Sequence, residues 1–109
     1  MGKLPKRLTI KPNLEELRKY INGEESFCPI AQAIMRKYNC SYASVDSYSA
    51  DIELPSYGSY SYRVDGKDAE ALENFVYQVD DARANEQNPF FSVSPNAPRP
   101  TIHFVLDTE

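Results

Sequence analysis

The feature that most constrains this chain is a run of three strand-like segments in the middle of the sequence. Residues 41–45, 50–54 and 59–65 are short and rich in Tyr, Val, Ile and Ser, and aromatic and β-branched residues favour strands. In the third segment apolar residues alternate with polar ones, as in an antiparallel strand with one face buried. The run therefore predicts a meander in which one face of each strand joins the core.

Two helices are expected before this run. Asn13 can cap the first one, because its side chain accepts from the free N–H groups of the first turn while Glu16 completes a capping box. Gly23 suits the left-handed residue that ends such a helix. The second helix is expected to begin near Cys28, with Pro29 at the first helical position, where a missing N–H costs nothing.

A third helix is expected after the run, through about Ala84. Asp68 suits its N-cap. Its apolar residues recur at i, i+3, i+4 and i+7, which is the strongest helical spacing in the chain. These residues are Leu72, Phe75, Val76 and Val79.

Strand signals near both ends complete the order of elements. Residues 7–11 and 102–106 alternate polar with apolar side chains, and residues 90–93 are also strand-like. The order is then β-α-α-β-β-β-α-β-β, with helices set apart from the run of strands, which favours an α+β fold. We expect a small antiparallel sheet of four to five strands with two to three helices packed on one face.

The 109 residues suit a single domain with one core. Residues 1–6 are expected to form a flexible basic tail, and the Pro-rich stretch 95–100 a connector to the last strand. The chain has no apolar run of roughly 20 residues, and no apolar stretch follows its basic start, so we expect neither a membrane span nor a secretory signal. Two cysteines are too few for a secreted framework, which favours reduced thiols and a cytoplasmic setting.

Charge is unevenly distributed along the chain, whose net charge is −4. Residues 1–37 hold eight basic and four acidic side chains, whereas residues 38–109 hold four basic and twelve acidic ones, so the two parts carry +4 and −8. Such asymmetry can mark an interaction surface. The simpler interpretation, which we favour, is that the two parts attract each other within the fold.

The sequence offers little for catalysis or for metal binding. Cys28, Cys40 and His103 are too few and wrongly spaced for a structural zinc site. A thiolate–imidazole pair of Cys28 with His103 is an alternative, because a helix N-terminus lowers a thiol pKa, but packing of Cys28 as a small apolar side chain is expected. Asp80 and Asp81 are adjacent on a helix and point about 100° apart, so the two carboxylates cannot share a substrate. We expect no catalytic residue, no metal and no cofactor.

Tyrosine is unusually frequent, with eight copies, and most of them lie in or beside the strand run. Tyr gives a large contact area at low entropic cost and is favoured at binding surfaces. Because acidic residues are interspersed among these tyrosines, a protein partner suits the region better than nucleic acid does. The alternative is that half of the tyrosines belong to the core. The binding residues predicted on this basis are Tyr48, Asp51, Glu53, Tyr57, Tyr60 and Tyr62.

Several short strings give the chain a resemblance to other proteins. Residues 28–33 (CPIAQA) have the form C-P-[IV]-A-x-A. Downstream follow, in order, Val45, YRVD at 62–65, a helix with Leu72, Phe75 and Val76 that ends at Asp80-Asp81, and PFFSV at 89–93. Over about residues 20–94 this layout resembles a group of small uncharacterised proteins encoded by bacteriophages and their bacterial hosts, notably actinobacterial ones. The resemblance implies a phage or mobile-element origin and a cytosolic setting, and it transfers no function.

Three functions follow from these features, in decreasing order of support. The first is a non-enzymatic interaction module that binds a host protein through the acidic, Tyr-rich surface. The second is a nucleic-acid-associated regulator that uses the basic residues Lys3, Lys6, Arg7 and Lys11. The third is a thiol enzyme centred on Cys28. A homodimer through the Tyr60/Tyr62 face or through an edge strand is compatible with all three, and no membrane partner is expected.

Overall fold

The protein is described by a computed structural model in which residues 5–55, 58–84 and 99–107 are placed. It contains a five-stranded antiparallel sheet with the strand order β1-β5-β4-β3-β2. The strands are β1 (Arg7–Ile10), β2 (Tyr42–Val45), β3 (Ser49–Leu54), β4 (Gly58–Val64) and β5 (Ile102–Leu106). The helices are α1 (Leu14–Ile21), α2 (Pro29–Tyr38) and α3 (Ala69–Ala84), with a 3-10 turn, η1 (Gly66–Asp68), directly before α3. The α+β fold with an antiparallel sheet is confirmed.

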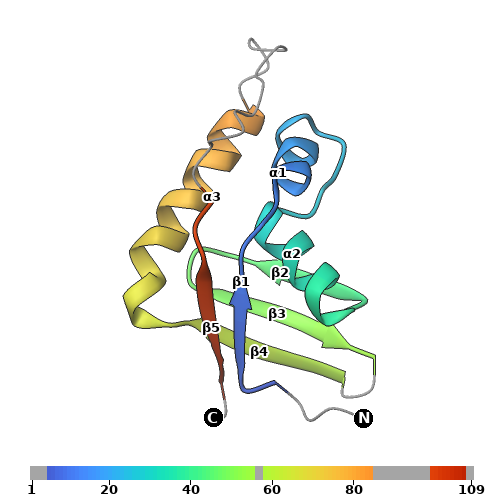
Figure 1. Cartoon of the computed structure of the whole chain (residues 1–109), viewed down its shortest axis with the longest axis vertical. Helices are drawn as coiled ribbons and strands as arrows, with labels where there is room; N and C mark the ends of the chain where they lie inside the picture. The colour runs from blue at the N-terminus through green and yellow to red at the C-terminus, as the bar shows by residue number, and fades with distance from the viewer. Residues whose placement is uncertain (1–4, 56–57, 85–98, 108–109) are drawn as a thin grey trace.

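Figure 1 shows how far the sheet twists: β3 and β4 run across the view, whereas β1 and β5 run along the length of the molecule. The helices pack against one face of this sheet, which we call the inner face, because buried residues of all three helices join the same core as the buried strand residues. The inner-face residues of that core are Leu8, Ile10, Ala43, Ala50, Ile52, Leu54, Tyr62, Ile102 and Phe104.

The opposite face of the sheet, which we call the outer face, is polar. Strand register explains the division, since side chains that are directly opposite each other on paired strands share a face. Ile52 is opposite Tyr60, whereas Asp51 is opposite Ser61. The exposed residues of the outer face include Arg7, Tyr42, Ser44, Asp51, Glu53, Ser59, Ser61 and Arg63.

The helix ends follow the local signals in the sequence. Asn13 and Glu16 form the expected capping box at α1, with Asn13 Oδ1 accepting from the Glu16 N–H at 2.8 Å and Glu16 Oε1 accepting from the Asn13 N–H at 2.9 Å. Gly23 adopts φ +78°, the left-handed conformation that ends the turn after α1. Pro29 opens α2, and Asn39 ends it with φ +54°.

The outer edge of β1 is covered by the end of α2. The hydroxyl of Tyr38 accepts a hydrogen bond from the Thr9 N–H at 3.2 Å, and Lys37 Nζ donates to the Thr9 carbonyl at 2.7 Å. These are backbone groups that an edge strand would otherwise offer to another chain. Pairing of two copies through this part of β1 is therefore opposed by side chains of the same molecule.

The expected third helix is present, but the side chain of its expected N-cap makes a long-range contact. α3 begins at Ala69, as expected for an N-cap at Asp68, and Asp68 is itself the last residue of η1. The carboxylate of Asp68 accepts instead from the backbone N–H of His103 at 2.9 Å and lies 2.8 Å from His103 Nδ1. The strand expected at residues 90–93, most of the connector 95–100 and most of the basic tail lie outside the described residues.

Helix length and hydropathy bear on membrane insertion. Within the described parts of the chain, no helix is long and apolar enough to cross a membrane.

Candidate functional site

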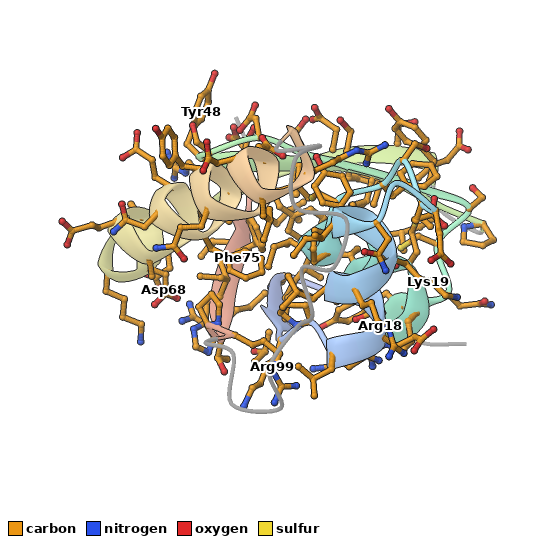
Figure 2. The ribbon with its side chains drawn as sticks, turned by 90° about the horizontal axis from the view of Figure 1, so that it is seen from above. Arg18, Lys19, Tyr48, Asp68, Phe75 and Arg99 are labelled. Carbon is orange, nitrogen blue, oxygen red and sulfur yellow. The ribbon has the colours of Figure 1, made fainter. Side chains whose placement is uncertain are left out.

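Three of the predicted binding residues lie together on the hairpin formed by β2 and β3. Asp51 and Glu53 are exposed on the outer face. Tyr48 lies in the turn between the two strands and is 66% exposed. In Figure 2 Tyr48 projects from the molecule well away from Arg18 and Lys19 of α1.

Tyr60 and Tyr62 point to the opposite side of the sheet, so the prediction that placed them on one surface with Asp51 and Glu53 is wrong. Tyr62 is 0% exposed, and its hydroxyl donates to the Pro5 carbonyl at 2.6 Å. Burial raises its pKa to about 12. This face also offers no surface for a homodimer through Tyr62, because the helices cover it. Tyr57, the remaining predicted residue, lies outside the described residues.

Tyr42 is a surface residue that the predicted site did not include. It is 47% exposed, and in the register of the hairpin it lies directly opposite Glu53. Strand alternation was the available signal, because Tyr42 and Ser44 share a face that is opposite to the face of buried Ala43. With Tyr48, Asp51 and Glu53, it completes what we call the hairpin surface.

The hairpin surface is ordered by short polar contacts. Asp46 Oδ1 accepts from the backbone N–H groups of Tyr48 and Ser49 at 2.9 and 2.7 Å, which fixes the turn that carries Tyr48. Ser61 Oγ donates to Asp51 Oδ1 at 2.5 Å. The first two bonds fix the backbone of the turn that carries Tyr48, and the third holds the Asp51 carboxylate in one orientation.

No known protein family, curated protein or solved structure matches this chain significantly.

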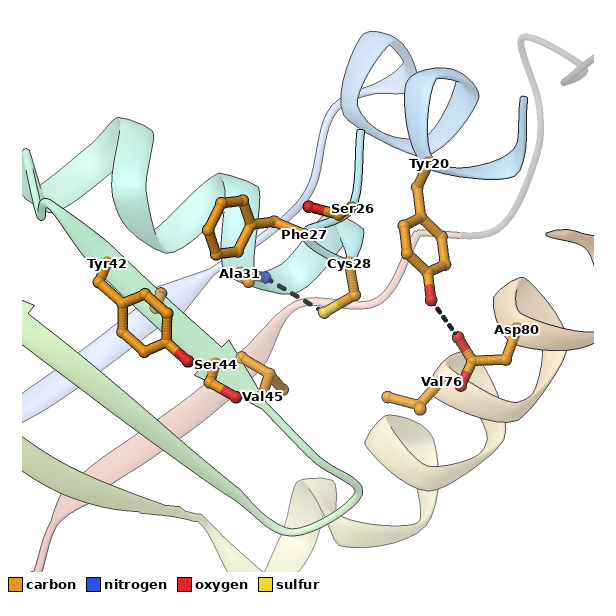
Figure 3. Close-up of a pocket in the computed structure, with 11 residues that line it drawn as sticks. Tyr20, Ser26, Phe27, Cys28, Ala31, Tyr42, Ser44, Val45, Val76 and Asp80 are labelled. Carbon is orange, nitrogen blue, oxygen red and sulfur yellow. Dashed lines mark hydrogen bonds between the residues drawn. The ribbon is translucent and has the colours of Figure 1, made fainter. Parts of the chain in front are cut away.

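A cavity of about 300 Å³ lies beside β2, between the start of α2 and the second half of α3. Figure 3 shows the rings of Phe27 and Tyr42 on one side of it, and Tyr20 with Asp80 on the other. Phe27 and Tyr42 meet edge to face, with their ring centroids 5.9 Å apart. We call this space the β2 cavity. Since Tyr42 and Ser44 line it as well, it adjoins the hairpin surface.

Cys28 lies in the wall of the β2 cavity at the N-cap of α2. Its Sγ accepts from the Ala31 N–H at 3.5 Å. Burial raises the pKa of the Cys28 thiol and outweighs the backbone N–H groups that lower it. His103 is engaged elsewhere, by Asp68. Both thiols are free of disulfide bonds, and a raised pKa disfavours the thiolate that a nucleophilic cysteine needs.

Metal ligands are not assembled in the part of the chain that can be described. Across the described residues, no group of three or more His, Cys, Asp and Glu side chains is arranged to hold a metal ion.

Three of the basic side chains near the start of the chain contact acidic ones. Arg7 contacts Asp65 at 2.8 Å, which joins the basic and the acidic parts of the chain. Arg18 and Lys19 both contact Glu15 within α1. Among these described pairs, Arg7–Asp65 joins the basic part (residues 1–37) to the acidic part (residues 38–109), whereas the α1 pairs lie within the basic part.

Proposed function

We propose that this chain is a non-enzymatic interaction module that binds another protein through the hairpin surface. The observation that carries the proposal is the exposure of two tyrosine rings, Tyr42 and Tyr48, on a hairpin that also carries the exposed carboxylates Asp51 and Glu53. Exposed aromatic side chains are costly to leave in water and are enriched in protein interfaces. Hydrogen bonds to Asp46 already fix the turn that carries Tyr48, which lowers the ordering cost of binding.

The charge of the hairpin surface favours a partner with a basic patch. Asp51 and Glu53 are both exposed, and residues 38–109 carry −8 overall. Complementary charge speeds encounter and selects among partners. The resemblance to phage-encoded proteins makes a host protein in the cytoplasm the class of partner that we favour.

The nucleic-acid alternative has less support. Arg7, Arg18 and Lys19 are each within 4.0 Å of a carboxylate, so contact with phosphate would have to compete with these pairs. Stacking of tyrosines on bases works in a basic groove, and the exposed tyrosines of the hairpin lie among acids. Nuclease treatment of the lysate distinguishes the two functions, because only binding through nucleic acid is lost when the nucleic acid is degraded.

The proposal is tested by capture from a lysate of the source organism, with the tagged chain in wild-type and Tyr48→Ala forms. The matched control is Tyr77→Ala, because Tyr77 is 72% exposed but lies on α3. We expect one protein to be enriched by wild type and by Tyr77→Ala, and to be reduced about tenfold or more by Tyr48→Ala, as for a central interface tyrosine. Capture is expected to weaken in 0.5 M salt, where the Debye length falls to about 4 Å.

Two outcomes would contradict this function. If Tyr48→Ala and Tyr77→Ala capture the same proteins in the same amounts, the hairpin surface is not the interface. If enrichment disappears after nuclease treatment, the nucleic-acid function takes its place.

A further inference from the structure

Asp80 places a carboxylate in the wall of the β2 cavity. Asp80 Oδ1 accepts from the Tyr20 hydroxyl at 2.5 Å. Burial and the bond to Asp80 raise the pKa of Tyr20 to about 12, so this hydroxyl keeps its proton and remains a donor. Among the residues that the structure places, no Lys, Arg or His nitrogen lies within 4.0 Å of the Asp80 carboxylate. The second oxygen of Asp80 is thus left for a donor from outside.

The remaining walls of the cavity suit the stem of a long cationic side chain. Phe27 and Tyr42 offer aromatic rings, and Val45 and Val76 offer apolar surface between those rings and Asp80. Aromatic faces attract cations, and Lys and Arg bury their methylene stems along apolar surface while the charged head meets a polar group. A volume of about 300 Å³ leaves room for one such side chain.

An arginine of the chain itself shows the same chemistry next to the cavity. The guanidinium of Arg83 lies over the ring of Tyr20, 4.4 Å from its centroid, and donates to the Glu25 carbonyl at 2.8 Å. Arg83 therefore stacks on Tyr20 and bonds to backbone, and it does not line the cavity. Its charge opposes a second cation to some extent, so the affinity of the cavity for an isolated side chain is expected to be low.

We infer that the β2 cavity takes a Lys or Arg side chain of the protein partner, with the cation at Asp80 and the stem against Phe27, Tyr42 and Val76. This inference rests on the proposed function, because Tyr42 borders both the hairpin surface and the cavity. A partner that lies on the hairpin can insert one residue past Tyr42. The basic partner that the hairpin charge favours is also the one that can supply this residue.

The test uses an isolated side chain as the probe. Nα-acetyl-L-arginine methylamide is titrated to 50 mM into ¹⁵N-labelled protein, in parallel with the citrulline analogue, which has nearly the same shape and no charge. We expect saturable shifts of the amides of Cys28, Ser44 and Val45, with citrulline binding about three- to tenfold more weakly. Asp80→Asn should abolish the difference between the two probes. Asp81→Asn should retain it, because Asp81 is an exposed neighbour that does not line the cavity.

The inference is overturned if arginine causes no shift around the cavity, if citrulline binds equally well, or if Asp80→Asn and Asp81→Asn behave alike. None of these results touches the hairpin surface, whose own test depends on Tyr48 against Tyr77. If the small probe binds as expected but Tyr48→Ala leaves capture unchanged, the cavity is a site for free organic cations, and the assignment to a protein partner fails.

Discussion

The two faces of the sheet are made from the same five strands but have opposite composition. The inner face carries large apolar side chains such as Ile52 and Phe104, which are covered by the helices. The outer face carries Ser, Asp and Glu side chains, which are open to solvent. Burial of apolar surface stabilises the fold, and exposed polar groups add little to stability. The comparison therefore separates residues that hold the fold together from residues that are free to bind.

The largest expected effect is on stability, and it compares two adjacent residues of β5 whose side chains point to opposite faces. Phe104 is 0% exposed, whereas Val105 is half-buried on the outer face, opposite Arg7 and Arg63. Phe104→Ala should lower the free energy of unfolding by about 3–5 kcal/mol, because it leaves a cavity in the core. Val105→Ala should cost about 1 kcal/mol or less.

Urea unfolding followed by circular dichroism measures both variants. Equal losses for the two would mean that the outer face is also buried, by a second copy or by another segment. That result would remove the distinction on which the proposed interface depends.

Much of the fold could be predicted because the signals that specify it are local. The capping box of Asn13 with Glu16, Pro29 at the start of α2 and the alternation in β4 each act within a few residues. The start of α3 at Ala69 agrees with an N-cap at Asp68, but the Asp68 carboxylate contacts His103, which is 35 positions away in the sequence. A cap and a long-range contact use the same carboxylate, and the sequence does not show which one the fold selects.

The candidate site could be predicted only in part. Alternation shows that Tyr60 and Tyr62 share a face of one strand, but strand register decides that Asp51 belongs to the other face. Without the register, acidic and aromatic residues close in sequence were assigned to one surface. The β2 cavity could not be foreseen at all, because it is formed by residues from α1, the start of α2, β2 and α3.

The second prediction concerns the contact between Asp68 and His103, a half-buried residue of the outer face. Burial by itself raises the pKa of Asp68, but hydrogen bonds from the side chain and backbone of His103 outweigh it, and the net pKa is lowered. A carboxyl whose folded-state pKa is lowered stabilises the fold above its unfolded pKa, about 3.9, and loses that contribution as pH falls through the folded value.

Asp68→Asn should therefore lower the free energy of unfolding by about 1.5 kcal/mol at pH 6, and the gap to wild type should narrow below about pH 4. Unfolding in urea at a series of pH values measures the gap. Glu70→Gln, at an exposed position in the first turn of α3, is the control and should change stability by less than about 0.5 kcal/mol. A gap that is constant from pH 6 to pH 3 would show that the ionised form of Asp68 contributes nothing.

The smallest expected effect on stability comes from removing either of two hydroxyl groups on adjacent residues of β4. Tyr62 donates to the Pro5 carbonyl from the inner face, and Ser61 donates to Asp51 on the outer face. Tyr62→Phe removes the donor from a buried position and leaves the ring in place, so it should cost about 1 kcal/mol. Ser61→Ala removes a solvated contact and should cost less than about 0.5 kcal/mol. Thermal unfolding of the two variants beside wild type resolves this difference.

Because Ser61 orders the Asp51 carboxylate, Ser61→Ala should weaken capture of the partner more than Tyr62→Phe does, although it is the less destabilising change. The reverse order in capture would mean that binding follows stability, and that the outer face of the hairpin contributes no specific contact.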